Sequence, residues 1–109
     1  MKALVLSSLS GPDALALQEV AEATPKTGHT MVGVRAGGLN FADIMTTRGG
    51  YPGTPPPPLI VGREFAGVEQ SSGQRVMGYA QWGAFAEKTA TYPNLSLIHI
   101  SEPTRQAEI

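Results

Sequence analysis

Glycine and proline interrupt this chain so often that no long apolar segment remains between them. The 109 residues include 13 Gly and 9 Pro, and the apolar runs that they separate are short. Short apolar runs bounded by turn residues are typical of strands rather than of helices. The sequence therefore predicts a mainly β (α+β) fold, a partly open β-barrel with one short helix.

These apolar runs predict strands along most of the chain. In the second strand, Leu15 and Leu17 are expected to face the core. In the third, the two-residue alternation of Val32, Val34 and Ala36 indicates a half-buried strand. The expected strands cover residues 2–8, 14–20, 29–36, 59–69, 75–79 and 83–89.

One helix is expected in the middle of the chain. Gly37-Gly38 is expected to break the third strand, and Asn40 is a favourable N-cap residue. Asp43 follows three positions later, near the positive end of the helix dipole. Gly49-Gly50 is expected to end the helix. The apolar residues that helical spacing places on one face are Phe41, Ile44 and Met45.

Pro52 and the run Pro55–Pro58 predict a stiff loop after this helix. A proline run of this kind could also serve as a polyproline ligand for an SH3-like domain. We favour a rigid crossing loop, because the run has no flanking basic residue and lies between expected elements.

Charge and composition exclude several classes of function. The formal net charge is −1 with no basic stripe, which argues against nucleic-acid binding. No run of like charge suggests a membrane surface. The chain has no cysteine, which excludes disulfides and cysteine-ligated zinc, and a metal site is not expected from two histidines. The first residues turn polar too soon for a signal peptide or a membrane span, so the expected location is the cytoplasm.

The stretch from Gly37 to Gly67 carries a family resemblance. It reads GGLNFADIMTTRGGYPGTPPPPLIVGREFAG. The order resembles the substrate-side domain of the medium-chain dehydrogenase/reductase superfamily, in its zinc-free quinone oxidoreductase branch. The resemblance extends over about residues 1–93 and implies a GroES-like barrel. The segment Trp82–Glu87 resembles the family's Gly-Gly-Tyr/Phe-Ala-Glu segment, whose aromatic side chains we expect in the core. His29 falls in a polar turn and is expected to be solvated.

The resemblance implies that the chain holds no catalytic zinc. In the zinc-dependent branch, the position of Asn40 is a cysteine ligand and that of Arg63 a histidine ligand. An asparagine is a poor zinc ligand, and the permanent positive charge of an arginine repels the ion. Ala42 replaces the hydroxyl residue that relays protons in that branch. Glu64 keeps a carboxylate found in both branches, with an expected role in an ion pair or hydrogen bonds inside the cleft.

The resemblance also implies a substrate and cofactor cleft, although it assigns no catalytic residue; the cleft residues are Asn40, Tyr51, Arg63 and Glu64. Asn40 is either an N-cap alone or a cap that also faces the nicotinamide. Tyr51 either lines the substrate pocket or packs under the proline loop. For Arg63 we favour an ion pair with Glu64 or Asp43 over direct contact with the cofactor.

The implied function is that of a larger protein. A parent of this kind is an NADPH-dependent quinone or enoyl reductase that passes hydride to a quinone or an α,β-unsaturated carbonyl, with a homodimer as its expected assembly. NADPH is expected to bind mainly to a separate Rossmann domain, because no G-x-G-x-x-G opens a helix in this chain. The chain alone is therefore expected to be inactive. The alternative is a stand-alone barrel that binds a protein partner and catalyses nothing.

The last fifteen residues are expected to be foreign to the domain. The segment LSLIHISEPTR, residues 95–105, resembles a translated sequencing adapter. We therefore expect residues 1–94 to form an incomplete GroES-like N-terminal domain and residues 95–109 to be a non-native tail. The alternative is a native strand over Leu95–Ile100, which is apolar and β-branched.

Overall fold

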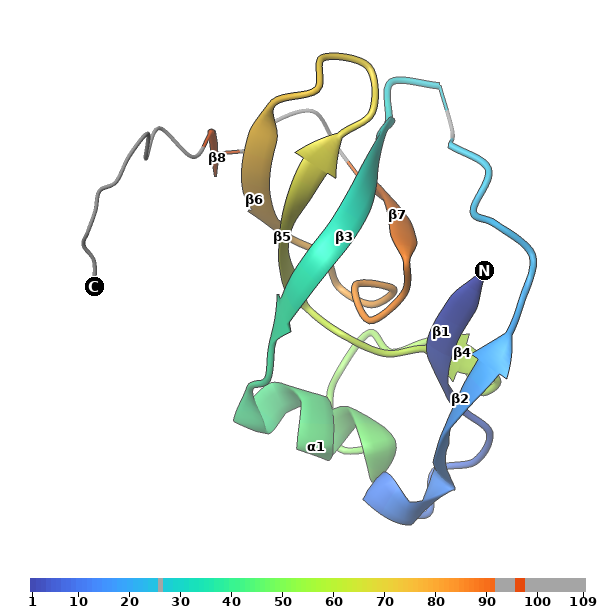
Figure 1. Cartoon of the computed structure of the whole chain (residues 1–109). Coiled ribbons are helices and arrows are strands. Elements are labelled where there is room, and N and C mark those ends of the chain that lie inside the picture. The colour runs from blue at the N-terminus through green and yellow to red at the C-terminus, as the bar shows by residue number, and fades with distance from the viewer. Residues whose placement is uncertain (26, 92–95, 98–109) are drawn as a thin grey trace.

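Two antiparallel sheets and one short α-helix make up the computed structural model, which describes residues 1–25, 27–91 and 96–97 (Figure 1). A 3-10 turn, η1, spans Pro12–Ala14, and the helix, α1, spans Phe41–Thr47. The strands are β1 (Lys2–Leu6), β2 (Leu15–Glu19), β3 (Thr30–Gly38), β4 (Leu59–Ile60), β5 (Glu64–Glu69), β6 (Arg75–Tyr79), β7 (Lys88–Thr91) and β8 (Ser96–Leu97).

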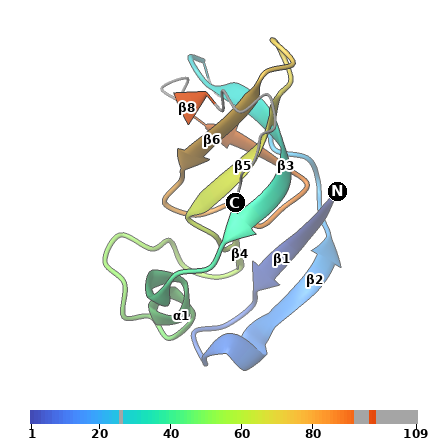
Figure 2. The same ribbon diagram turned by 60° about the vertical axis from the view of Figure 1, so that its left-hand side comes forward.

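The segment between β6 and β7 joins the two sheets. One sheet has the order β2-β1-β4 and the other β7-β3-β5-β6-β8, and Figures 1 and 2 show them side by side with α1 at one end. The backbone N–H of Leu4 donates to Phe85 O at 2.8 Å, and Glu87 N–H donates to Lys2 O at 3.0 Å. On the other side, Val34 N–H donates to Glu87 O at 2.8 Å. This arrangement confirms the mainly β fold with one short helix.

The core consists of two apolar clusters that share one aromatic side chain. The ring of Phe85 packs against both clusters and so connects the interiors of the two sheets. Burial of apolar surface of this kind is the main favourable term in folding. The first cluster contains Val32, Phe65, Val76 and Ala84, and the second Leu6, Leu59 and Val61.

Two expected core positions are exposed. Leu17 is 68% exposed, because β2 is an edge strand that pairs only with β1. Ala36 is also exposed, because a register shift between Val34 and Ala36 in the pairing with β5 breaks the alternation. Val32 is buried, Val34 half-buried, and Leu15 packs on the second cluster, as predicted.

Three strand boundaries differ from the prediction. Gly37-Gly38 does not break β3 but pairs with the first residues of β5. The strand expected over residues 59–69 is divided into β4 and β5 at Gly62, whose φ of 111° suits glycine alone. The last expected strand begins only at Lys88, because Gly83 has a φ of 98° and residues 84–87 connect the sheets instead.

Both ends of α1 follow the sequence prediction. The backbone N–H of Asn40, at the N-cap, donates to Oδ2 of Asp43 at 2.8 Å, which is one arm of a capping box. The Asp43 N–H in turn donates to the backbone carbonyl oxygen of Asn40 at 3.0 Å. At the other end, Gly49 N–H donates to Thr46 O and Gly50 N–H to Met45 O. This pair of bonds is a Schellman motif, with Gly49 at a φ of 78°.

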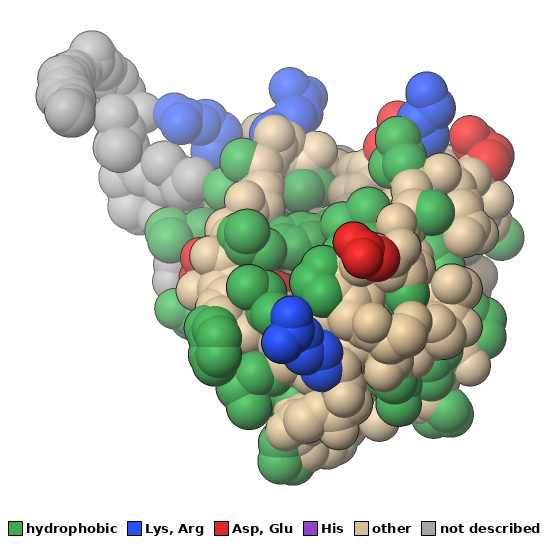
Figure 3. Space-filling model, turned by 90° about the horizontal axis from the view of Figure 1, so that it is seen from below, with side chains coloured by type: hydrophobic (Ala, Val, Ile, Leu, Met, Phe, Trp, Pro, Cys, Tyr) green, Lys and Arg blue, Asp and Glu red, His purple; other side chains and the backbone are tan. Residues whose placement is uncertain are grey.

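The expected apolar face of α1 is not its buried face. Phe41 is 73% exposed, whereas the buried residues are Asp43, Thr46 and Thr47. The two threonine hydroxyls donate to carbonyls of their own helix, so their burial leaves no donor unpaired. The helix is joined to η1 by a backbone bond from Gly11 N–H to Thr47 O, 3.0 Å. Figure 3, which views the end of the molecule with α1, shows hydrophobic side chains interspersed with backbone and other side chains, and a basic and an acidic side chain near the centre of that face.

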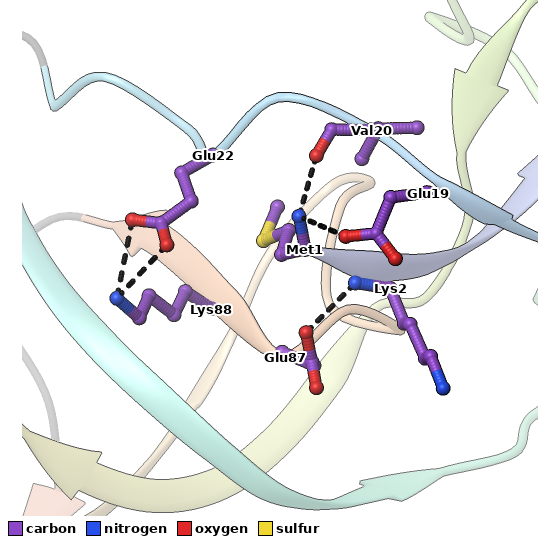
Figure 4. A network of polar contacts seen from close by, with 7 residues as sticks. All are labelled: Met1, Lys2, Glu19, Val20, Glu22, Glu87 and Lys88. Atoms are coloured by element: carbon purple, nitrogen blue, oxygen red, sulfur yellow. Dashed lines mark hydrogen bonds and ion pairs between the residues drawn. The ribbon is translucent and has the colours of Figure 1, made fainter.

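Polar contacts hold the start of the chain against β2 and the region of β7 (Figure 4). The terminal ammonium of Met1 contacts Val20 O at 2.6 Å and the Glu19 carboxylate at 2.9 Å. The Glu87 carboxylate accepts from the Lys2 backbone N–H at 2.8 Å. Lys88 and Glu22 form an ion pair at 3.1 Å.

Of the fifteen residues expected to be a foreign tail, only the backbone of β8 lies within the described residues. There, Leu97 pairs with Val76 and Ser96 with Met77. Residues 95 and 98–109 lie outside the described residues, so the tail hypothesis stays a prediction. In the part of the chain that the structure describes, no helix has the length and apolarity to cross a membrane.

Candidate substrate cleft

The antiparallel pairing of β3 with β5 brings three predicted site residues, Asn40, Arg63 and Glu64, to one end of the larger sheet. The last pair of this ladder joins Gly38 with Glu64. Asn40 follows two residues after Gly38, and Arg63 directly precedes Glu64. Because antiparallel strands run in opposite directions, both positions extend past the same end of the ladder.

Gly37 and Gly38 allow close packing at this end of β3. A Cβ atom on Gly38 would overlap the Glu64 carboxylate, and one on Gly37 would lie 2.7 Å from the ring of Phe85. The absence of side chains therefore lets Glu64 and Phe85 lie against the strand. Glu64 also lines a cavity of about 430 Å³ together with Met77.

Arg63 is held between an aromatic ring and a backbone carbonyl. Its guanidinium carbon lies 4.2 Å from the centroid of the Tyr51 ring, a cation–π distance. Its Nη1 donates to Gln81 O at 3.0 Å. The loop that carries Tyr51 is braced by a 2.8 Å bond from the Thr54 hydroxyl to Tyr51 O. Tyr51 and Arg63 are both half-buried, so the structure brings these two predicted site residues into contact.

The predicted ion pair of Arg63 is wrong. Glu64 begins β5 and its carboxylate lies against Gly38, whereas Arg63 precedes the strand and turns toward Tyr51. Asp43 is engaged with the backbone N–H of Asn40. Between described residues, the ion pairs that form are Met1–Glu19 and Lys88–Glu22.

Asn40 caps α1 through its backbone N–H and through the side-chain arm of the capping box. Its side chain is exposed and donates to Gly38 O through a long bond of 3.4 Å. The buried polar group at this end is Asp43, which is 4% exposed and whose Oδ1 has no hydrogen-bond partner in the described part of the chain. Because the amide of Asn40 is exposed, it remains able to donate to a ligand. The sequence signal for Asp43 was its N3 position, which predicts a cap but not burial.

A second cavity, of about 650 Å³, opens beside Arg63. Trp82 lines it and is 42% exposed, so the prediction of a core position is wrong for Trp82, although it is right for Phe85. His29, expected in solvent, is half-buried in the same wall. The described residues that line this cavity are Thr24, His29, Arg63, Tyr79, Ala80, Gln81, Trp82, Ala90 and Thr91.

Sequence reasoning missed Gln81 and Trp82 as parts of the site. Gln81 acts through its backbone carbonyl, which any residue could supply, so its side chain gave no signal. Trp82 was assigned to the core because aromatic side chains usually pack there. As for metals, the described residues contain no group of three or more His, Asp or Glu side chains placed to hold an ion.

Comparison with known proteins places this geometry in context. A family model described as the alcohol dehydrogenase GroES-like domain matches residues 26–101. The Mus musculus synaptic vesicle membrane protein VAT-1 homolog-like is 33% identical over 100 residues, which cover 84% of this chain and 24% of that protein. The Mus musculus quinone oxidoreductase-like protein 2 is 34% identical over 99 residues, covering 83% of this chain and 28% of that protein.

Among solved structures, the quinone oxidoreductase from Thermus thermophilus, studied alone and with NADPH, superposes with a TM-score of 0.80 at 35% identity. That match covers 96% of this chain and 34% of the other. The chain thus spans about a quarter of the length of the curated relatives that it matches and about a third of this solved structure.

Proposed function

Since the chain belongs to the alcohol dehydrogenase GroES-like domain family, with relatives among the quinone oxidoreductases and VAT-1 homologues, we propose that it is the substrate-side part of a longer reductase. That protein reduces a quinone or an α,β-unsaturated carbonyl with NADPH and without zinc. The observation that carries the proposal is the guanidinium of Arg63 stacked on Tyr51 at the end of the β3–β5 ladder.

The zinc-free part of the proposal follows from the groups at this end of the ladder. Arg63 carries a permanent positive charge, which opposes the binding of a divalent cation beside it. Asn40 offers an amide, and the chain has no cysteine to supply a thiolate. These donors do not fit a tetrahedral zinc site.

The same groups fit the nicotinamide end of a dinucleotide. The exposed amide of Asn40 and the hydroxyl of Tyr51 are neutral hydrogen-bonding groups suited to orienting a carboxamide or a substrate oxygen. When bound, NADPH supplies the hydride, and the protein supplies orientation and a cleft shielded from water. We propose that Arg63 and Tyr51 form one wall of that cleft. Glu64 keeps the backbone that frames the cleft in place.

The coding sequence that follows Asn94 in the source DNA is the first test. A G-x-G-x-x-G fingerprint between a strand and a helix supports a reductase, because that motif holds the pyrophosphate of a dinucleotide. A stop codon directly after the codon for Asn94 would favour the alternative, a barrel that binds a protein partner.

The second test is the activity of the longer protein. We expect NADPH consumption with quinones or enones, unchanged by a chelator, and no saturable NADPH binding by the present chain alone. One zinc per chain, with activity lost on chelation, would overturn the zinc-free mechanism. The homodimer and the cytoplasmic location stay predictions.

A further inference from the structure

Two contacts hold the side chain of Arg63 in place. Its guanidinium rests on the Tyr51 ring at 4.2 Å, and Nη1 donates to Gln81 O at 3.0 Å. A guanidinium has five N–H donors, so most of them remain available after this one bond. Because the group is held from two sides, little side-chain entropy would be lost when it binds a ligand.

No described carboxylate compensates this charge. Glu64 lies against Gly38, and Asp43 accepts from the backbone of Asn40. The described residues that line the cavity beside Arg63 include no acidic side chain. A half-buried cation without a counter-ion is unfavourable, because its lost hydration is replaced only in part. An anionic ligand would supply the missing partner.

The cavity indicates what kind of anion fits. Its volume of about 650 Å³ is in the range of small-molecule sites. Its lining includes the aromatic residues Trp82, which is 42% exposed, and Tyr79, which is 80% exposed at the rim, together with the hydroxyl-bearing residues Thr24 and Thr91. Aromatic walls favour a flat, conjugated body, and the planar fork of an arginine matches a carboxylate through two parallel hydrogen bonds.

We propose that Arg63 forms a carboxylate-binding subsite in this cavity, and that its ligand is a small aromatic or conjugated acid. The inference rests on the proposed function and deepens it by defining the substrate class: an electrophile that carries its own carboxylate. The binding itself depends only on Arg63, which the Tyr51 ring holds from one side, and on the cavity walls.

Titration of the present chain with trans-cinnamate tests the proposal, with cinnamamide as the uncharged control of the same shape. Trp82 is the single tryptophan of the chain, so its indole N–H gives one assignable signal in a ¹H–¹⁵N NMR spectrum. We expect saturable shifts of this signal with cinnamate, and binding of cinnamamide weaker by about tenfold or more. Inorganic phosphate, which is anionic but not planar, is expected to bind more weakly than cinnamate.

Matched arginine variants locate the site. Arg63→Gln should weaken cinnamate binding roughly ten- to a hundredfold, because charge-assisted hydrogen bonds are lost. Arg35→Gln, which removes the same charge from an exposed position on β3, should leave the affinity unchanged. Arg63→Lys should retain only part of the affinity for cinnamate, since a lysine lacks the planar fork.

Equal binding of cinnamate and cinnamamide, or no saturable binding of either, would overturn the proposal even if Arg63→Gln fails to fold. Equal losses in Arg63→Gln and Arg35→Gln, or phosphate binding as tight as cinnamate, would do the same. The cinnamate titration involves neither NADPH nor turnover, so the two proposals can fail separately. A negative reductase assay would leave observed cinnamate binding valid, and a lack of cinnamate binding would leave the proposed reductase activity standing.

Discussion

Asp43, not Asn40, is the residue on which the start of α1 depends. Asp43 is buried and accepts a 2.8 Å bond from the Asn40 N–H, whereas the Asn40 side chain is exposed and, besides its arm of the capping box, makes a long bond of 3.4 Å to Gly38 O. A partly buried hydrogen bond that loses its acceptor leaves an unpaired donor, and this costs more than the loss of a long, exposed contact.

We therefore predict that Asp43→Ala lowers the free energy of unfolding by roughly 1–3 kcal/mol. Asn40→Ala should cost less than about 1 kcal/mol, at the lower end for an N-cap. Asp43→Asn is the matched control, because its amide oxygen can still accept from Asn40. Urea unfolding of the three variants measures their free energies of unfolding. A loss in Asn40→Ala equal to or greater than the loss in Asp43→Ala would contradict the prediction.

At the scale of elements, the β3–β5 ladder depends on one very close approach between backbones. A Cβ atom on Gly67 would overlap the carbonyl group of Gly33, whereas one on Gly33 would meet only Val68 O, at 3.8 Å. These two glycines lie on adjacent strands, but only Gly33 has room for a Cβ atom. Gly67 lies on the same strand as Glu64, at which this ladder reaches the cleft.

Gly67→Ala is accordingly predicted to destabilise the chain by about 1–3 kcal/mol, the range for an overpacked interior. Gly33→Ala should be neutral within about 0.5 kcal/mol, since it adds an ordinary contact and reduces the freedom of the unfolded chain. Thermal unfolding of the two variants provides the comparison. Equal thermal midpoints for Gly67→Ala and Gly33→Ala would show that β3 and β5 can move apart to accommodate a Cβ atom without loss of stability.

At the scale of the whole molecule, the remaining question concerns the last residues. The backbone of β8 extends the larger sheet by pairing with Val76 and Met77 of β6. A two-residue pairing at a sheet edge adds few hydrogen bonds, and a foreign tail would not have been selected to pack on the barrel.

Deletion of residues 95–109 is therefore predicted to lower Tm by no more than about 4 °C, the shift that ~1 kcal/mol produces in a domain of this size. Deletion of residues 98–109 alone, which keeps β8, is the control. If the longer deletion lowers Tm by much more than the shorter one, β8 is a native strand and the boundary at Asn94 is wrong.

The sequence predicted features that depend on neighbouring residues and missed those that depend on distant ones. The caps of α1 were predictable because Asn40 and Gly49 act on backbone groups within one turn. Gly37-Gly38 was interpreted as a strand break because its real cause, the proximity of Phe85 and Glu64, has no local signature. The contact of Arg63 with Tyr51 likewise arises from a loop path that no periodicity encodes.

The bonds between β1 and residues 85–87 also affect how the chain forms during synthesis. The backbone of Lys2 bonds Glu87, a separation of 85 residues, and Leu4 N–H donates to Phe85 O. At roughly 5–20 residues per second, a ribosome needs several seconds to make the partner of the first strand. Until then the backbone groups of Lys2 and Leu4 that bond residues 85–87 lack their partners, so the first strand of the nascent chain stays incompletely paired until most of the described chain has been made.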